Sequence, residues 1–226
     1  MTIPTPADTR TLTCRAVLFD MDGTLVDSTA IVEQVWSEFS ARYGLDFAEI
    51  LRTSHGVQAG DTVRRFAPAG ADVVALTAEL GAAERVRTAG IVALPGAAEL
   101  LRILPGDAVA LVTSADRILA DIRMEAAGLA MPATAVTAEL VTRGKPHPEG
   151  YLQAAGLLGV EPSDALVFED APAGIAAGLA AGIRTVAVGP NTGPLPDGVL
   201  HISDYSDVSV AVETDAAGAR VISFRL

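Results

Sequence analysis

The sequence predicts an α/β protein in which a parallel sheet is interrupted by an inserted block of helices. Short uncharged apolar runs at residues 16–19, 108–112 and 165–168 are typical of strands buried on both faces. Helical segments separate these runs, and such alternation predicts βαβ units and a parallel sheet. Between residues 28 and 93, helices follow one another with no strand-like run, so we interpret this block as an inserted domain.

The chain begins this pattern with a strand at residues 16–19, which ends at Asp20 and the turn signal Asp22-Gly23. Asp27 or Ser28 is expected to cap a helix that begins near Thr29 and stops at Gly44. The predicted helices of the inserted block then lie near residues 47–52, 59–66 and 71–89. The segment 94–96, Leu-Pro-Gly, marks the return to alternation.

The remaining elements follow in order along the second half of the chain. The predicted helices are 97–103, 117–127, 149–158 and 173–181, and the predicted strands are 108–112, 133–137, 165–168 and 185–188. Residues 208–212 and 220–224 alternate around 215–218, which predicts a C-terminal hairpin. We therefore divide the chain into a discontinuous core, 1–27 and 94–226, and a helical domain, 28–93.

Composition limits the partners and the compartment. The formal net charge of −12 disfavours nucleic acids and anionic membranes, because both attract basic patches. Residues 1–13 lack the pattern of a signal peptide, and no apolar stretch approaches the ~18 residues of a membrane span. The single cysteine, Cys14, excludes an intramolecular disulfide and fits a reducing compartment. We expect a cytoplasmic protein that is a monomer or a weak homodimer.

The basic residues are unusual in type. Of the 16 lysines and arginines, Lys145 is the only lysine. It lies in the segment 144–148, Gly-Lys-Pro-His-Pro, where two prolines prevent regular structure. Because a compact ammonium fits crowded sites that a guanidinium does not, this lysine is a candidate functional residue.

Polar side chains follow three of the predicted strands. Asp20 and Asp22 follow the first, Thr113 and Ser114 follow 108–112, and the pair Glu169-Asp170 follows 165–168. Because the carboxyl ends of parallel strands meet at one edge of a sheet, we expect these groups and Lys145 to face one crevice.

The residue types suit phosphoryl transfer. An aspartate can attack a phosphate monoester to form an aspartyl-phosphate, and Mg²⁺ held by carboxylates reduces the repulsion between the two anions. Asp20 and Asp170 form the natural carboxylate pair for Mg²⁺, and Lys145 is expected to place a further positive charge on the phosphoryl oxygens and on the nucleophile. The Thr113 hydroxyl and the Ser114 N–H can donate to phosphoryl oxygens. Asp22 is left as the general acid and base.

Four segments together resemble the haloacid dehalogenase-like phosphatases. They are residues 19–28 (FDMDGTLVDS), 112–114 (VTS), 144–148 (GKPHP) and 168–174 (FEDAPAG), and they occur in the family's order across nearly the whole chain. The resemblance implies a Rossmann-like core with an α-helical cap domain inserted after the first motif. It also implies that Asp20 is the nucleophile and Asp22 the acid and base, with the Asp22 backbone carbonyl on the metal.

The same resemblance implies that Asp170 binds Mg²⁺ directly and that Glu169 acts directly or through water. Residues 54–56, 65–68, 144–149 and 167–178 are most similar to the sugar- and polyol-phosphate phosphatases of the glycerol-3-phosphatase and 2-deoxyglucose-6-phosphatase group. That group has a substrate-reading loop in the cap, which makes His55, Gln58 and Arg64 candidates for contacts with sugar hydroxyls.

Three functions remain open from the sequence. The first is a Mg²⁺-dependent phosphatase of a small sugar or polyol phosphate. The alternative is a sugar phosphomutase, which uses the same residues but must keep water away from the aspartyl-phosphate. A binding protein without catalysis is the third, and the complete set of motif residues argues against it.

Overall fold

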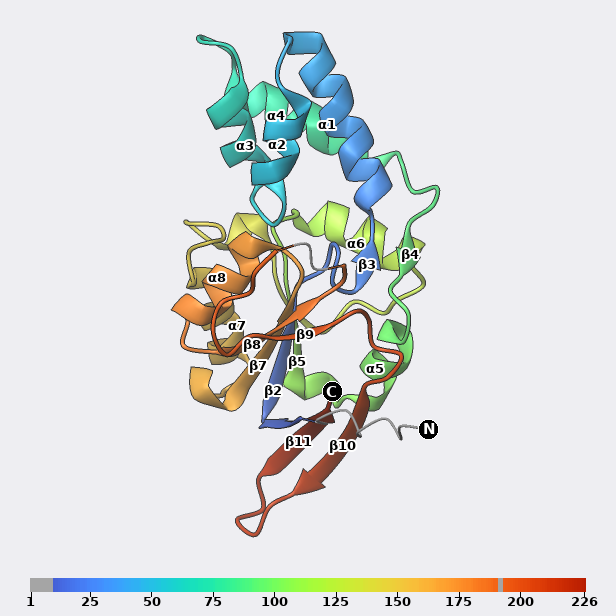
Figure 1. The fold of residues 1–226 in the computed structure, drawn as a ribbon, viewed down its shortest axis with the longest axis vertical. Helices are drawn as coiled ribbons and strands as arrows, with labels where there is room; N and C mark the ends of the chain where they lie inside the picture. The colour runs from blue at the N-terminus through green and yellow to red at the C-terminus, as the bar shows by residue number, and fades with distance from the viewer. Residues whose placement is uncertain (1–9, 191–192) are drawn as a thin grey trace, which may run out of the picture.

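The computed structural model describes residues 10–190 and 193–226, and it has three parts along its longest axis (Figure 1). A block of helices lies at one end, a six-stranded sheet with helices on both sides lies in the middle, and a three-stranded sheet lies at the other end. The α/β architecture predicted from the sequence is confirmed.

The central sheet is parallel throughout, in the order β6-β5-β2-β7-β8-β9. Its strands are β2 (Ala16–Phe19), β5 (Val109–Val112), β6 (Thr134–Val136), β7 (Ala165–Glu169), β8 (Arg184–Val188) and β9 (Leu200–Ile202). The first five match the predicted runs. The edge strand β9 was not predicted, because its three partly exposed residues form no apolar run.

Helices cover both faces of this sheet. On one face pack α5 (Ala97–Ile103) and α6 (Arg117–Ala126), and on the other α7 (Glu149–Leu157) and α8 (Pro172–Ala180) (Figure 1). Successive strand residues alternate between the two layers, so Phe19 and Leu18 belong to different hydrophobic clusters. Phe19 stacks on Phe168 with ring centroids 5.2 Å apart. Burying each such side chain contributes about 1.5–3 kcal/mol.

The inserted block has a hydrophobic core of its own. It consists of α1 (Thr29–Tyr43), α2 (Phe47–Ser54), α3 (Ala59–Phe66) and α4 (Val73–Arg85), and Trp36, Phe39 and Ile50 lie in its centre. The last helix is shorter than the predicted 71–89. It begins after Asp72, whose side chain caps it, and it ends at Arg85. We call this block the cap.

The two chain segments that connect the cap to the core pair with each other. They are the two-residue strands β3 (Val26–Asp27) and β4 (Val92–Ala93), which are antiparallel and too short to leave a pattern in the sequence. Of the two predicted caps of α1, Asp27 accepts a hydrogen bond from Thr29 N at 3.1 Å, whereas the Ser28 hydroxyl donates to Asp22. Gly44, with a positive φ of 65°, ends the helix as predicted.

The far end of the molecule is a small antiparallel sheet. The predicted hairpin is β10 (Ser209–Thr214) and β11 (Arg220–Arg225), and β1 (Thr11–Cys14) adds to β11 as a third strand that was not predicted. Cys14 is buried, and burial raises its pKa to about 12, so its thiol is inert at neutral pH.

Short 3₁₀ turns occupy Gly106–Ala108, Ala138–Leu140 and Pro162–Asp164. Within the described ranges, no helix has the length and apolar character needed to cross a membrane.

Candidate active site

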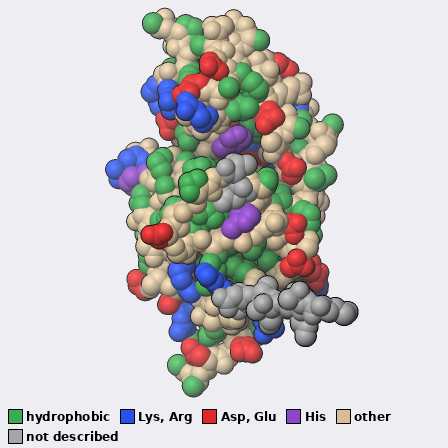
Figure 2. Space-filling view, in the orientation of Figure 1, with side chains coloured by type: hydrophobic (Ala, Val, Ile, Leu, Met, Phe, Trp, Pro, Cys, Tyr) green, Lys and Arg blue, Asp and Glu red, His purple; other side chains and the backbone are tan. Residues whose placement is uncertain are grey.

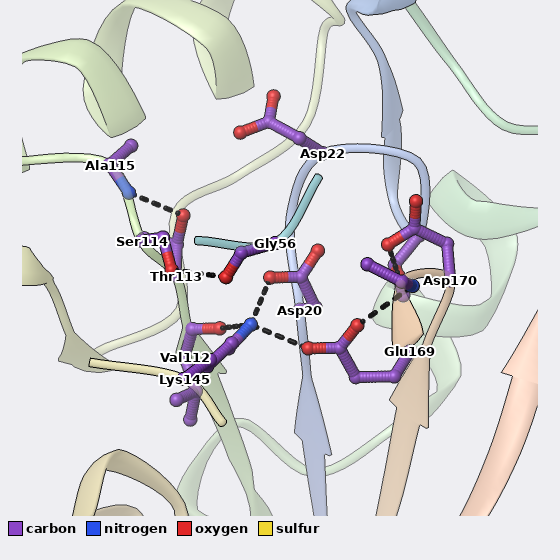
Figure 3. A network of polar contacts seen from close by, with 12 residues as sticks. Asp20, Asp22, Gly56, Val112, Thr113, Ser114, Ala115, Lys145, Glu169 and Asp170 are labelled. Atoms are coloured by element: carbon purple, nitrogen blue, oxygen red, sulfur yellow. Dashed lines mark hydrogen bonds and ion pairs between the residues drawn. The ribbon is translucent and has the colours of Figure 1, made fainter. Parts of the chain in front are cut away.

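The site forms where three neighbouring strands end. In the sheet, Phe19 of β2 is aligned with Leu111 of β5 and with Phe168 of β7, so the chain leaves all three strands at the same level. Asp20 N continues the ladder by donating to Phe168 O at 3.0 Å. As the sequence predicted, the polar groups that follow these strands gather at one edge of the sheet (Figure 3).

Lys145 reaches this edge from the irregular loop before α7. Its Nζ donates to Asp20 Oδ1 at 2.5 Å, to Glu169 Oε1 at 2.6 Å and to the Val112 carbonyl at 3.0 Å (Figure 3). Burial disfavours the charge on Lys145, but the two carboxylates outweigh it and raise the pKa of the ammonium. The lysine therefore remains charged throughout the physiological range.

Three carboxylates surround a common point. Asp20, Glu169 and Asp170 each have an oxygen within 4.8 Å of the other two. Burial and repulsion from Glu169 raise the pKa of Asp20 to about 7 in spite of Lys145, and burial and repulsion from Asp20 raise the pKa of Asp170 well above its usual value. Crowded, partly uncompensated carboxylates of this kind fit a hard divalent cation with oxygen ligands.

Glu169 differs from the other two carboxylates because protein donors occupy both of its oxygens. Oε1 accepts from Lys145 and from the Tyr151 hydroxyl at 2.8 Å, and Oε2 accepts from Ala171 N at 3.2 Å. The side chain is fully buried. Glu169 therefore holds Lys145 in place, while Asp20 and Asp170 are the carboxylates better suited to contact a metal. Tyr151, which sequence reasoning missed, completes this support.

Two glycines make room for these carboxylates. A Cβ added at Gly174 would lie 1.6 Å from Glu169 Oε1, and one at Gly23 would lie 2.1 Å from Asp170 Oδ2. Gly23 also has a positive φ of 82°, which favours glycine. The close approach of Glu169 and Asp170 to the neighbouring backbone thus depends on the absence of side chains at these two positions.

Thr113 and Ser114 follow β5, which lies beside β2 on the side away from β7. Thr113 Oγ1 accepts a hydrogen bond from Ala115 N at 3.1 Å, and the Ser114 hydroxyl donates to the carbonyl of Gly56 at 2.7 Å. Gly56 belongs to the cap loop after α2, and a Cβ there would lie 2.8 Å from the Ala171 Cβ. The cap loop is therefore inserted between two core loops at the edge of the site.

Asp22 lies apart from the lysine network, with its carboxylate directed away from Lys145 (Figure 3). Its Oδ1 accepts from the Ser28 hydroxyl at 2.6 Å, and its Oδ2 lies 2.7 Å from Arg123 Nη1. Arg123 is only 4% exposed. Arg123 was not identified from the sequence. Its position four residues after Leu119, on the buried face of α6, does indicate a paired arginine, because buried arginines are almost always paired.

A cavity of about 400 Å³ separates the cap from these groups. Asp20, Asp22, Asp170, Thr113 and Ser114 line its core side. On the cap side, the cavity is lined by residues of α1 and α4 and by the loop after α2. This loop carries two of the predicted substrate residues, His55 and Gln58. Gln58 Nε2 donates to the Ala138 carbonyl at 3.1 Å, which ties this loop to the core.

Arg64, the third predicted substrate residue, does not line this cavity. Its side chain is 66% exposed and pairs with Asp61 at 2.5 Å. Figure 2 shows basic side chains gathered on the outer surface of the cap, over α3, and Arg64 and Arg65 belong to the last turn of that helix. The structure thus brings together all the predicted core residues and two of the three predicted cap residues.

Comparisons with known proteins show a family in which the chain has many relatives. The family model for haloacid dehalogenase-like hydrolases matches residues 14–182. Hexitol phosphatase A of Escherichia coli is 47% identical over 179 residues, which cover 77% of this chain and 83% of that protein. Glycerol-1-phosphate phosphohydrolase 2 of Saccharomyces cerevisiae is 36% identical over 191 residues, 78% of this chain and 75% of that protein.

Among solved structures, β-phosphoglucomutase of Clostridium difficile superposes with a TM-score of 0.74, at 21% identity, over 85% of this chain and 92% of that one. At this identity the likeness shows the fold alone. The family match covers most of the chain, and the two phosphatases are similar to it over three quarters of its length. The chain therefore belongs to the haloacid dehalogenase-like hydrolase family and is an enzyme.

Proposed function

We propose that this protein is a Mg²⁺-dependent phosphatase that hydrolyses a small sugar or polyol phosphate monoester through an aspartyl-phosphate on Asp20. The observation that carries the proposal is the placement of Asp20. Its carboxylate lies 2.5 Å from the Lys145 ammonium and within 4.8 Å of the Asp170 carboxylate. A nucleophile held between a lysine and a potential metal site is suited to attack phosphorus, because both positive groups offset the charge of the phosphate.

In the proposed reaction, Asp20 attacks phosphorus and the bond to the ester oxygen breaks, while Asp22 gives a proton to the departing alkoxide. Water then attacks the aspartyl-phosphate, Asp22 takes its proton, and phosphate leaves with Asp20 restored. The Thr113 hydroxyl and the Ser114 N–H hold the phosphoryl oxygens, while Lys145, whose three hydrogens are bound to Asp20, Glu169 and the Val112 carbonyl, positions Asp20 and adds positive charge beside it. Asp20, Asp170 and the Asp22 carbonyl would hold Mg²⁺, which would supply charge neutralisation at phosphorus, and Glu169 would support the site through Lys145.

Asp22 is in a resting orientation in this proposal. Both of its oxygens are occupied, one by Ser28 and one by Arg123, so it must release one of them before it can protonate an ester oxygen. Because Ser28 begins the first cap helix, a movement of the cap can free Asp22 as substrate enters. Cap movement would then couple substrate binding to the first proton transfer.

The charge of the cavity favours the phosphatase over the phosphomutase. A mutase must accept phosphate at both ends of its sugar, which requires positive charge away from the nucleophile. In the described part of the chain, Arg123 is the only lysine or arginine that lines the cavity, and it is already paired with Asp22 and Glu84. Asp116, which forms an ion pair with Arg85, and Glu139 line the same cavity. The described part of the cavity wall therefore offers a second phosphate no unpaired positive charge, whereas a hydroxylated tail can donate hydrogen bonds to the Glu139 carboxylate.

Two of the relatives are a hexitol phosphatase and a glycerol-1-phosphate phosphohydrolase, which supports a polyol phosphate as substrate. All the proposed catalytic groups come from one chain, which is consistent with a monomer or weak homodimer. The buried free thiol of Cys14 fits a reducing compartment, so we propose a cytoplasmic location.

The test is a panel of hexitol, glycerol and hexose phosphates assayed for released phosphate with Mg²⁺ and with EDTA. We expect turnover that requires Mg²⁺ and that disappears in Asp20→Asn, while circular dichroism and Tm show that the variant remains folded. Turnover retained by Asp20→Asn would contradict the covalent mechanism. Conversion of one sugar phosphate into its isomer without phosphate release would favour the mutase.

A further inference from the structure

An ion pair between the cap and the core lies in the wall of the cavity. Glu84, in the last turns of cap helix α4, faces Arg123 of core helix α6, with Oε2 3.5 Å from Nη2. Both side chains are largely buried, with exposures of 11% for Glu84 and 4% for Arg123, and both line the cavity. The pair therefore belongs to the space in which a substrate would lie.

The pair is incompletely satisfied. Arg123 donates one hydrogen bond, from Nη1 to Asp22, but Nε and Nη2 are buried without a hydrogen-bond partner within the described ranges. The contact of Nη2 with Glu84 is an ion pair at 3.5 Å and not a hydrogen bond. Buried polar atoms without partners are costly and rare in folded proteins. An arginine donor and a carboxylate acceptor that face one cavity in this state indicate a site that a ligand completes.

We propose that Glu84 and Arg123 form a subsite that binds hydroxyl groups of the substrate, an inference that rests on the proposed phosphatase function. A hydroxyl is both a donor and an acceptor, so it can donate to the Glu84 carboxylate while it accepts from Arg123 Nη2. A second phosphate does not fit, because the Glu84 carboxylate would repel it. An aliphatic tail does not fit either, because it would leave Nε and Nη2 unpartnered.

The cap helix is shaped for such a ligand. Thr77, Gly81 and Glu84 line the cavity at helical spacing, so they form one face of α4. A Cβ at Gly81 would make only an ordinary contact, 3.9 Å from Arg85 Nη2, and the glycine itself leaves the cavity wall without a side chain three residues before Glu84. The same face therefore offers room for a carbon chain next to the carboxylate that binds its hydroxyls.

The test compares ester substrates with and without hydroxyl groups. Glucitol 6-phosphate and glycerol 1-phosphate carry hydroxyl groups. Propyl phosphate has the same three-carbon chain as glycerol 1-phosphate but no hydroxyl group. Glu84→Gln keeps the shape of the side chain and removes its charge. Because hydrogen bonds to charged groups are the stronger ones, we expect kcat/KM of this variant to fall about tenfold or more for glucitol 6-phosphate. We expect a change below about twofold for propyl phosphate.

Two further variants make the result specific. Glu79→Gln is the matched control, because Glu79 lies on the same helix but is 53% exposed and pairs with Arg42. It should leave kcat/KM unchanged for all three esters. Glu84→Asp keeps the charge but withdraws it by one methylene, and it should show the same selective loss as Glu84→Gln. If Glu84→Gln does not fold by circular dichroism, Glu84→Asp decides.

Each outcome either supports or overturns the subsite. A selective loss on the hydroxylated esters supports it. An equal loss on all three esters would overturn it and assign Glu84 to the positioning of Asp22 through Arg123. Unchanged kinetics in both Glu84 variants would overturn the subsite while the phosphatase function stands. If the wild-type protein releases no phosphate from any of the three esters, the proposed function fails and the subsite with it.

Discussion

The Lys145 ammonium lies 2.5 Å from Asp20 Oδ1 and uses its other two hydrogens on Glu169 Oε1 and the Val112 carbonyl. An ammonium has three donors, and each of them points at an acceptor in a site where the lysine side chain is only 6% exposed. A planar guanidinium is larger and cannot direct three hydrogens in this way. The geometry thus explains why the single lysine in a chain with 16 basic residues stands at this position.

We expect Lys145→Arg to lower kcat/KM at least 100-fold, although charge is conserved. The guanidinium has no room beside the fully buried Glu169, so it must displace either Asp20 or Glu169 from its place. Phosphate release under saturating Mg²⁺ measures the effect. Arg143→Lys is the control, since Arg143 is two residues away and 68% exposed, and it should retain nearly normal activity. Activity of Lys145→Arg close to wild type would contradict the crowding argument.

Asp22→Asn tests the general acid. An amide cannot give a proton to an alkoxide, so we expect loss to depend on the leaving group: about 100-fold or more for a polyol phosphate, and much less for p-nitrophenyl phosphate, whose leaving group needs no proton. The ratio of kcat/KM on the two esters is the measurement. Ser28→Ala is the comparison variant, because it removes the hydrogen bond to Asp22 Oδ1 but leaves the carboxyl able to donate. An equal loss of Asp22→Asn on both esters would count against this role.

Most of the fold was predictable because its signals are local. The buried strands β2, β5 and β7 are apolar runs, and each ends in a polar residue, so topology alone brings Asp20, Thr113 and Asp170 together. Strands β3 and β9 escaped prediction because they are too short for a pattern. β1 escaped because its place beside β11 depends on a pairing more than 200 residues away in the sequence.

The site was predictable where a role is attached to a motif and not where it depends on packing. Asp20 and Lys145 lie in segments whose residues suggest chemistry. Arg123 lies inside a helix, and only the structure shows that it joins Asp22 to Glu84 across the interface between core and cap. Arg64 shows the reverse case. It has a suitable charge and position in the sequence, but the last turn of α3 directs it outward to Asp61.

Mg²⁺ binding should depend on pH in the neutral range. Burial and the neighbouring carboxylates raise the pKa of Asp20 to about 7, above about 3.9 for an unfolded aspartate. A raised folded-state pKa means that the metal-free protein loses stability as pH rises from about 4 to 7, and that Mg²⁺ must displace a proton below pH 7. We expect the affinity for Mg²⁺, measured by isothermal titration calorimetry, to be about tenfold weaker at pH 6 than at pH 8.

The raised pKa of Asp170 acts in the same direction. Titrations in buffers of different ionisation enthalpy should therefore show protons released on Mg²⁺ binding near pH 7. Asp20→Asn removes one of the competing protons, so its Mg²⁺ affinity, although weaker, should vary less with pH. Equal affinity of the wild-type protein at pH 6 and pH 8 would show that Asp20 is already ionised in the metal-free protein.

The close contact between Gly174 and Glu169 predicts opposite effects for two glycine substitutions. Ala is a better helix former than Gly by about 1 kcal/mol, and Gly156 in α7 has no atom within 4 Å of an added Cβ. Gly156→Ala should therefore raise the free energy of unfolding by about 0.5–1 kcal/mol. Gly174→Ala would place its Cβ 1.6 Å from Glu169 Oε1, so it should lower the free energy of unfolding by about 1–3 kcal/mol.

Activity should separate the two variants further. Glu169 can make room for a Cβ at Gly174 only if it moves relative to Lys145 and Tyr151, to which its Oε1 is hydrogen-bonded. We therefore expect phosphate release by Gly174→Ala to fall more than its stability loss accounts for, measured well below its Tm, while Gly156→Ala remains fully active. If both substitutions stabilised the protein, or if Gly174→Ala kept normal activity, the tight fit of Glu169 against α8 would not be what holds the lysine beside Asp20.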